Sequence, residues 1–74
     1  MSEKQVSFKV PGMSCEHCKM AITKAIDQLE GVQSVEIDLG RKLVNVTYEE
    51  TKINPTELEK AINNAGYEVK NKKL

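Results

Sequence analysis

Both cysteines and the only histidine of this chain fall in one short segment, residues 12–18, Gly-Met-Ser-Cys-Glu-His-Cys. Before it, the alternation of Val6, Phe8 and Val10 predicts a half-buried strand. After it, apolar residues recur at helical spacing, at Ala21, Ile22, Ala25, Ile26 and Leu29. The two thiols are therefore expected where a strand ends and a helix begins. The backbone N–H groups and the positive dipole end at a helix start favour thiolate, the form that binds metal or attacks a disulfide.

The length of the chain indicates one small domain. Its 74 residues are close to the lower limit for a self-supporting core. We expect a single domain over 1–74, with its core at about 5–70 and a loose basic tail at 71–74. A chain of this size has little room for a deep substrate pocket, so we do not expect an enzyme.

Charge and hydropathy argue against several classes of protein. The 11 Lys and Arg balance the 11 Asp and Glu, so the chain has no global attraction to nucleic acid or to an anionic membrane. No apolar run follows the N-terminal residues, so we expect neither a signal peptide nor a membrane span. The expected location is the reducing cytoplasm. There, two cysteines three residues apart indicate a metal-binding or a redox role.

Alternating apolar residues predict four strands. The first covers 5–10, the second 35–39 and the third 44–48, and a short last strand begins at Tyr67 and Val69. A hairpin turn at Gly40–Arg41 is expected to join the second strand to the third.

Capping signals predict where the two helices begin and end. Ser14 is expected as the N-cap of the first helix, which runs to about Glu30, with Gly31 following its last turn. The second helix is expected to begin after the N-cap Asn54, with proline at its first position, and Gly66 closes it.

The order strand, helix, strand, strand, helix, strand indicates a ferredoxin-like βαββαβ fold. This is a two-layer α+β sandwich with a four-stranded antiparallel sheet and two helices on one face. RNA-binding domains share this order, but they carry aromatic residues on the outward face of their central strands. The outward positions of the third strand here are Leu43, Asn45 and Thr47, so we exclude nucleic acid as a partner.

Four interpretations of Cys15 and Cys18 are open. Two soft thiolates suit Cu(I), which accepts few ligands. Structural zinc nearly always takes four ligands, and the chain offers two sulfurs and one imidazole. A thiol–disulfide oxidoreductase also uses Cys-x-x-Cys, but this chain has no tryptophan and no proline placed to face the disulfide. The fourth interpretation is two ordinary small residues near a helix start.

The segment 12–18 resembles the Gly-Met-x-Cys-x-x-Cys signature of heavy-metal-associated domains. The segment 66–69, Gly-Tyr-Glu-Val, is similar to the last strand of the bacterial copper chaperones in that family. The resemblance implies Cu(I) held by Cys15 and Cys18 and delivered by thiolate exchange to a P-type copper-transporting ATPase with similar domains. A copper-responsive repressor is a further partner that it suggests. The apo form is expected to be a monomer, and a dimer linked by copper remains an alternative. Transport of another thiophilic metal, Hg, Zn or Cd, is a further alternative.

Four residues are expected around the two ligands: Met13, Ser14, His17 and Tyr67. Met13 is expected to plug the core and anchor the loop, and His17 to point to solvent rather than to ligate. Tyr67 follows from topology, because the turn after the second helix reaches the same end of the sheet as the cysteine loop. Its ring then covers the helix end as packing, or its hydroxyl donates a hydrogen bond to a sulfur.

Overall fold

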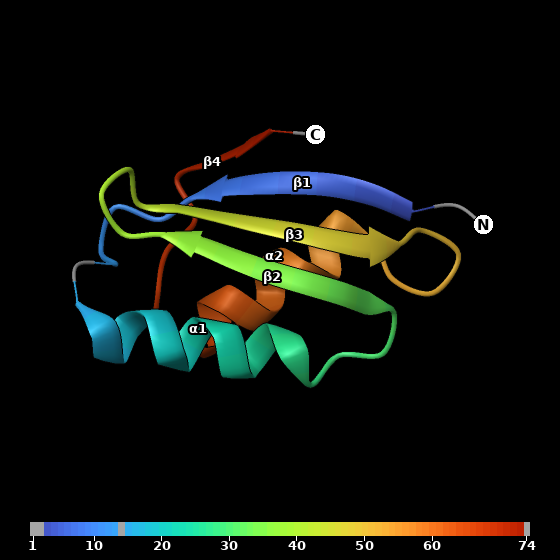
Figure 1. Ribbon diagram of the computed structural model, residues 1–74, viewed down its shortest axis with the longest axis horizontal. Helices are drawn as coiled ribbons and strands as arrows, with labels where there is room; N and C mark the ends of the chain where they lie inside the picture. Colours follow the sequence, from blue (N-terminus) through green and yellow to red (C-terminus); the bar gives the residue numbers. More distant parts are fainter. Residues whose placement is uncertain (1–2, 14, 74) are drawn as a thin grey trace.

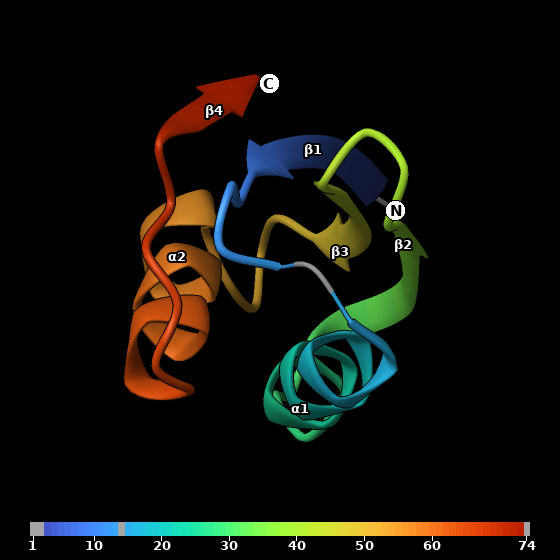
Figure 2. The same ribbon diagram turned by 90° about the vertical axis from the view of Figure 1, so that its left-hand side faces the viewer.

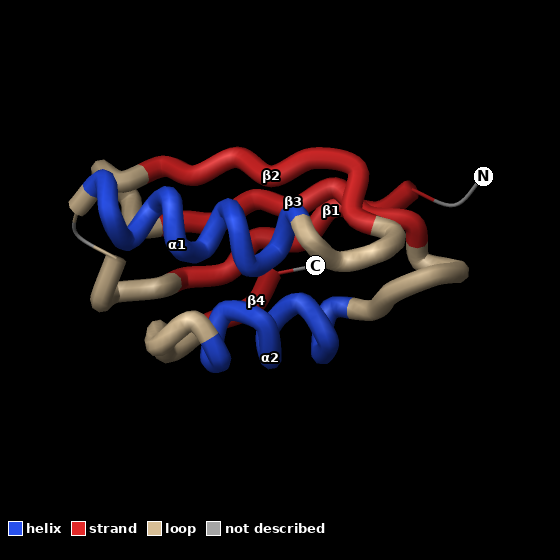
Figure 3. Tube along the Cα trace, turned by 90° about the horizontal axis from the view of Figure 1, so that it is seen from below, coloured by secondary structure: helices blue, strands red, loops and turns tan. Residues whose placement is uncertain are grey.

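The structure, a computed structural model, describes residues 3–13 and 15–73. These residues form a four-stranded antiparallel sheet that two helices cover on one face. Both helices lie on the same side of the strands, in front of them when the molecule is seen from below (Figure 3). The elements, in order, are β1 (Glu3–Lys9), α1 (Glu16–Asp27), β2 (Val32–Asp38), β3 (Leu43–Glu49), α2 (Pro55–Asn64) and β4 (Asn71–Lys73).

The strand order in the sheet is β2-β3-β1-β4, and every neighbouring pair is antiparallel (Figure 1). β1 is therefore central, between β3 along its whole length and the short β4 at its end. This arrangement confirms the predicted ferredoxin-like α+β sandwich. No helix in the described residues is long and apolar enough to cross a membrane.

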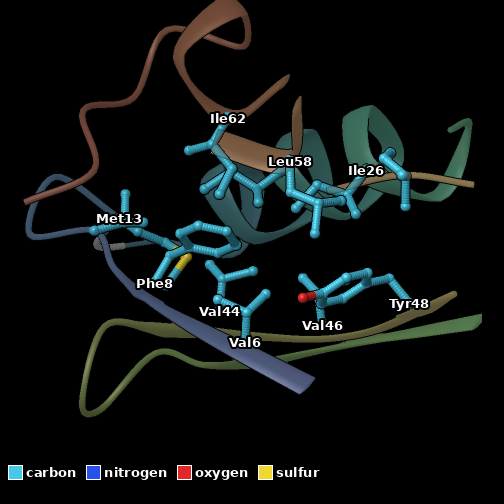
Figure 4. Packing of buried hydrophobic residues seen from close by; sticks show 12 residues of the cluster. Val6, Phe8, Met13, Ile26, Val44, Val46, Tyr48, Leu58 and Ile62 are labelled. Carbon is cyan, nitrogen blue, oxygen red and sulfur yellow. The ribbon is translucent and has the colours of Figure 1, made fainter. Parts of the chain in front are cut away.

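The core lies between the sheet and the helices. Its members are the inward residues of β1 and β3, the buried faces of both helices, and residues of the connecting loops (Figure 4). They are Val6, Phe8, Val10, Met13, Ile22, Ile26, Val44, Val46, Tyr48, Ile53, Leu58 and Ile62. The alternation and the helical spacing predict most of these residues. Ile53 was expected in a polar connection, yet it is 6% exposed, because its side chain packs in the hydrophobic core and against Gly31.

Local chemistry fixes both ends of α2. The Oδ1 atom of Asn54 accepts the N–H of Glu57 at 2.9 Å, as predicted for an N-cap, and Pro55 follows at the first helical position. At the other end, the N–H of Gly66 bonds to the carbonyl of Asn63 at 3.0 Å, and the N–H of Tyr67 bonds to the carbonyl of Ile62 at 3.2 Å. These two bonds form a Schellman motif, and Gly66 takes the positive φ of 99° that the motif needs.

The predicted limits of α1 are wrong at both ends. The N-cap is Cys15, in an extended conformation, and its side chain makes no capping hydrogen bond. Ser14, the predicted cap, lies outside the described residues. The helix ends at Asp27 with Gln28 as its C-cap, so Gly31 does not follow its last turn. Gly31 instead has a φ of 100° in the turn before β2. A Cβ atom there would lie 2.9 Å from the Cβ of Lys52, so glycine allows that close approach.

Two further predictions about the strands need correction. Residues 67–70 are not a strand, and 71–73, expected to be a loose tail, form β4. Backbone pairing to the open edge of β1 orders this tail, since Ser7 lies opposite Lys73 and Lys9 opposite Asn71. The turn between β2 and β3 is present but longer than two residues, because β2 ends at Asp38 and β3 begins at Leu43.

Candidate metal centre

The loop from β1 to α1 is anchored in the core at its start. The N–H of Val10 bonds to the carbonyl of Lys42 at 2.9 Å, and the N–H of Met13 bonds to the carbonyl of Val10 at 3.0 Å. The side chain of Met13 is completely buried and lies beside Phe8 at one end of the core (Figure 4). Met13 is therefore the plug that the sequence predicts, and its burial fixes the position of the loop that carries the thiols.

The two cysteines are brought together at the start of α1. Cys15 is exposed at the N-cap, and Cys18 is half-buried in the first turn, packed against the core. Their Sγ atoms are 3.1 Å apart, and the two cysteines are not joined in a disulfide. The carbonyl of Cys15 accepts the N–H of Lys19 at 3.1 Å, which closes the first turn around the pair. Both sulfurs therefore stand at the positive end of the helix dipole, which stabilises thiolates.

Tyr67 reaches the same place from the other half of the chain. Residues after α2 and the loop before α1 both lie at the end of the molecule that faces the viewer in Figure 2. The side chain of Tyr67 hydrogen-bonds to Cys18. This bond, then desolvation, then the negative charge of Cys18 and Cys15 raise the pKa of Tyr67 above its ordinary value. The Tyr67 hydroxyl therefore stays protonated and acts as the hydrogen-bond donor to the sulfur of Cys18. Tyr67 therefore interacts with the thiols as expected from topology, and its role toward a bound ion stays a prediction.

The remaining candidates near the thiols do not complete a larger ligand set. His17 and Glu16 are exposed on the first turn of α1. Within residues 3–13 and 15–73, no group of three or more His, Cys, Asp or Glu side chains is placed to hold a metal ion. The described residues therefore offer two sulfurs as donors, with one side open to solvent at Cys15.

This donor set has a clear chemical preference. Two soft thiolates with an open side suit a soft monovalent cation of low coordination number, such as Cu(I). They do not satisfy zinc, which requires four ligands in a closed structural site.

A ferredoxin-like sandwich with a Cys-x-x-Cys pair at the start of its first helix defines a class of small domain that presents two thiols at one end of its sheet. The chain belongs to the heavy-metal-associated domain family, which matches residues 7–68.

Individual relatives agree with this family. The copper chaperone CopZ of Staphylococcus haemolyticus strain JCSC1435 is 43% identical over 63 residues, covering 85% of this chain and 93% of that protein. Oxidised MerP from Ralstonia metallidurans CH34 superposes with a TM-score of 0.87 at 35% identity, covering 95% of this chain and all of that one. The Cu(I)-loaded N-terminal domain of a potential copper-translocating P-type ATPase from Bacillus subtilis has a TM-score of 0.84 at 28% identity. It covers 100% of this chain and 88% of that one.

Proposed function

We propose that this chain is a copper chaperone that carries Cu(I) between Cys15 and Cys18 and does not act as an enzyme. The observation that carries the proposal is the pair of reduced cysteines whose sulfurs lie 3.1 Å apart at a helix start, with no third ligand among the described residues. The similarity to a protein named copper chaperone CopZ supports copper as the cargo. The softness of the donors independently favours Cu(I) over zinc.

Binding of the ion requires the two sulfurs to move apart. With the zinc–thiolate bond length of about 2.3 Å as a guide, two sulfurs on opposite sides of an ion lie about 4.6 Å apart. The present separation is 3.1 Å. Cys18 is half-buried and hydrogen-bonded to Tyr67, whereas Cys15 is exposed. The smallest movement that separates the two sulfurs is therefore a change of side-chain rotamer at Cys15.

Delivery proceeds in this proposal by thiolate exchange. An acceptor thiolate approaches the ion from the open side at Cys15 and forms a shared intermediate with three sulfurs. The bonds to this chain are then released one at a time. The acceptor is a domain of similar structure on a P-type copper-transporting ATPase, a partner suggested by the structural likeness to such a domain in its Cu(I)-loaded state. The exchange would take place in the cytoplasm, and a copper-responsive repressor is a second acceptor of the same chemistry.

The main competing function is that of a thiol–disulfide oxidoreductase. It is favoured by the short sulfur–sulfur distance and by the existence of an oxidised form of the relative MerP. A redox catalyst needs a disulfide of tuned potential, whereas a carrier needs its thiols to stay reduced. The two functions therefore differ in what the reduced protein does when an acceptor is present.

A transfer experiment separates these functions. The reduced, Cu(I)-loaded protein is mixed with an isotope-labelled Cys-x-x-Cys acceptor domain, and the metal is followed by the NMR shifts of the acceptor. We expect transfer within the mixing time and insulin reduction close to the uncatalysed rate. Insulin reduction at the rate of a true oxidoreductase, without transfer of copper, would instead assign the pair to redox catalysis.

A further inference from the structure

Five of the 11 basic residues of this chain gather around one hollow of about 990 Å³. They are Lys9, Lys42, Lys70, Lys72 and Lys73, and Leu43 lies among them. No Asp or Glu is among the described residues that line the hollow. The balanced total charge therefore conceals a local concentration of positive charge.

Strand pairing shows on which face the hollow lies. Lys9 is opposite both Leu43 of β3 and Asn71 of β4, and Ser7 is opposite Lys73. Paired residues of neighbouring strands share a face, and successive residues alternate between faces. Because Phe8 points into the core, Lys9, Leu43 and Lys73 point to the helix-free face of the sheet. The hollow thus crosses β4, β1 and β3 on the side away from both helices.

Three of these lysines are available for a partner. Lys72 is already paired with Glu59 of α2 at 3.2 Å, and the Nζ atom of Lys9 donates to the carbonyl of Arg41 at 2.8 Å. Lys42, Lys70 and Lys73 form no side-chain hydrogen bond or ion pair with the other described residues. The pairing of β4 with β1 holds Lys73 over the sheet, so ordering of the tail assembles the positive surface.

We propose that this hollow binds an acidic segment of a partner protein, whose carboxylates lie on Lys42, Lys70 and Lys73 while an apolar side chain contacts Leu43. The floor supports a peptide, since Leu43 and Pro11 line the hollow together with the aliphatic stems of the lysines. The proposal does not depend on which metal the thiols carry. Pro11 of the β1–α1 loop lines the hollow but neither cysteine does, and Cys15 is exposed, so a partner held there leaves Cys15 accessible.

Two other polyanions fit this surface less well. Single-stranded nucleic acid needs aromatic side chains for base stacking, and none lines the hollow. A membrane-surface site combines basic residues with exposed apolar anchors. The exposed large hydrophobic residue among the described positions is Met20, at 65%, and it belongs to α1 on the opposite layer.

The test uses an acidic peptide of alternating Glu and Asp around a central leucine, titrated into the reduced, isotope-labelled full chain. We expect amide shifts confined to the strands around the hollow, and binding that weakens as salt is raised. The variant Lys42→Gln/Lys70→Gln/Lys73→Gln keeps side-chain length and removes three charges. At about two- to fivefold per lysine, the three losses multiply, so the variant should bind the peptide about 8- to 125-fold more weakly.

A matched control removes the same charge elsewhere, with Lys24→Gln/Lys52→Gln/Lys60→Gln on the helices and the loop before α2. It should change the affinity by no more than about twofold. An equal loss in both triple variants would mean unspecific attraction and overturn the proposal. The proposal would also be overturned if phosphatidylserine vesicles bound the same lysines more tightly than the peptide does. It would equally be overturned if a peptide with Gln and Asn in place of the acidic residues bound as well as the acidic peptide.

Discussion

Replacing Met13 separates its role as a buried plug from a role as a sulfur ligand. Its side chain is completely buried in the core beside Phe8, so Met13→Ala removes a buried side chain and leaves a cavity at the base of the cysteine loop. Such truncations cost about 2–5 kcal/mol of stability. A chain of 74 residues has a total free energy of unfolding of about 4–11 kcal/mol. We therefore expect Met13→Ala to lose a large share of its stability in urea denaturation.

The informative comparison is with Met13→Leu, which removes the sulfur but nearly conserves volume. We expect it to lose less than about 1.5 kcal/mol and to keep its affinity for Cu(I) in competition with a chelator. Leu58→Ala is the matched control for stability, since Leu58 is also completely buried but lies in α2. It should be as unstable as Met13→Ala, yet bind Cu(I) more tightly than that variant, because the loop keeps its anchor. A loss of Cu(I) affinity in Met13→Leu comparable to that of a cysteine variant would refute the assignment of Met13 as a plug.

Three further predictions concern the thiols and their neighbour. Tyr67→Phe removes the hydrogen bond to Cys18 and should lower the Cu(I) affinity by about tenfold. Tyr67→Ala should lower the affinity further and speed the exchange of copper. If affinity and exchange are unchanged in both variants, Tyr67 contributes only packing. The raised pKa of Tyr67 means that the native state favours the protonated phenol, so its contribution to stability is complete below the ordinary tyrosine pKa and is lost as pH rises through the higher native value. In Cys18→Ser the ring resonances of Tyr67 should titrate closer to the ordinary value, and an unchanged titration would contradict the contact as the cause. The metal-free reduced protein should be folded and should show dispersed amide signals in NMR, because the buried core residues that the structure describes include neither cysteine. A disordered spectrum of the metal-free protein would show that the metal supplies the folding energy.

The elements that the sequence predicts best are those fixed by local chemistry. Asn54, Pro55 and Gly66 define α2 through hydrogen bonds within a few residues, so the pattern of side chains is sufficient. The inward residues of β1 and β3 follow from simple alternation. The proximity of Tyr67 to the thiols could also be predicted, because the Schellman motif and the order of strands together determine where the chain emerges from α2.

The errors arise where distant backbone contacts decide the structure. Residues 71–73 have no apolar pattern of a strand, and only the open edge of β1 makes them one. Gly31 looked like the end of a helix, whereas its positive φ serves a close approach to Lys52, which is remote in sequence. The basic surface on the sheet was also hidden, since the lysines of β4 join Lys9 only through that pairing.

The central claim, that Cys15 and Cys18 are the two ligands of a Cu(I) carrier, is tested most directly by a competition titration. The reduced protein is titrated with Cu(I) against a strong Cu(I) chelator and, separately, with Zn(II), alongside Cys15→Ser, Cys18→Ser and His17→Ala. We expect one tightly held Cu(I) per chain, weak Zn(II) binding, and a loss of Cu(I) affinity by orders of magnitude in either cysteine variant, since serine is a hard, protonated donor. His17→Ala should leave the affinity unchanged, because His17 is exposed and outside any described ligand group. Zn(II) binding that outcompetes Cu(I), or a histidine variant as damaged as a cysteine variant, would contradict the two-sulfur copper site.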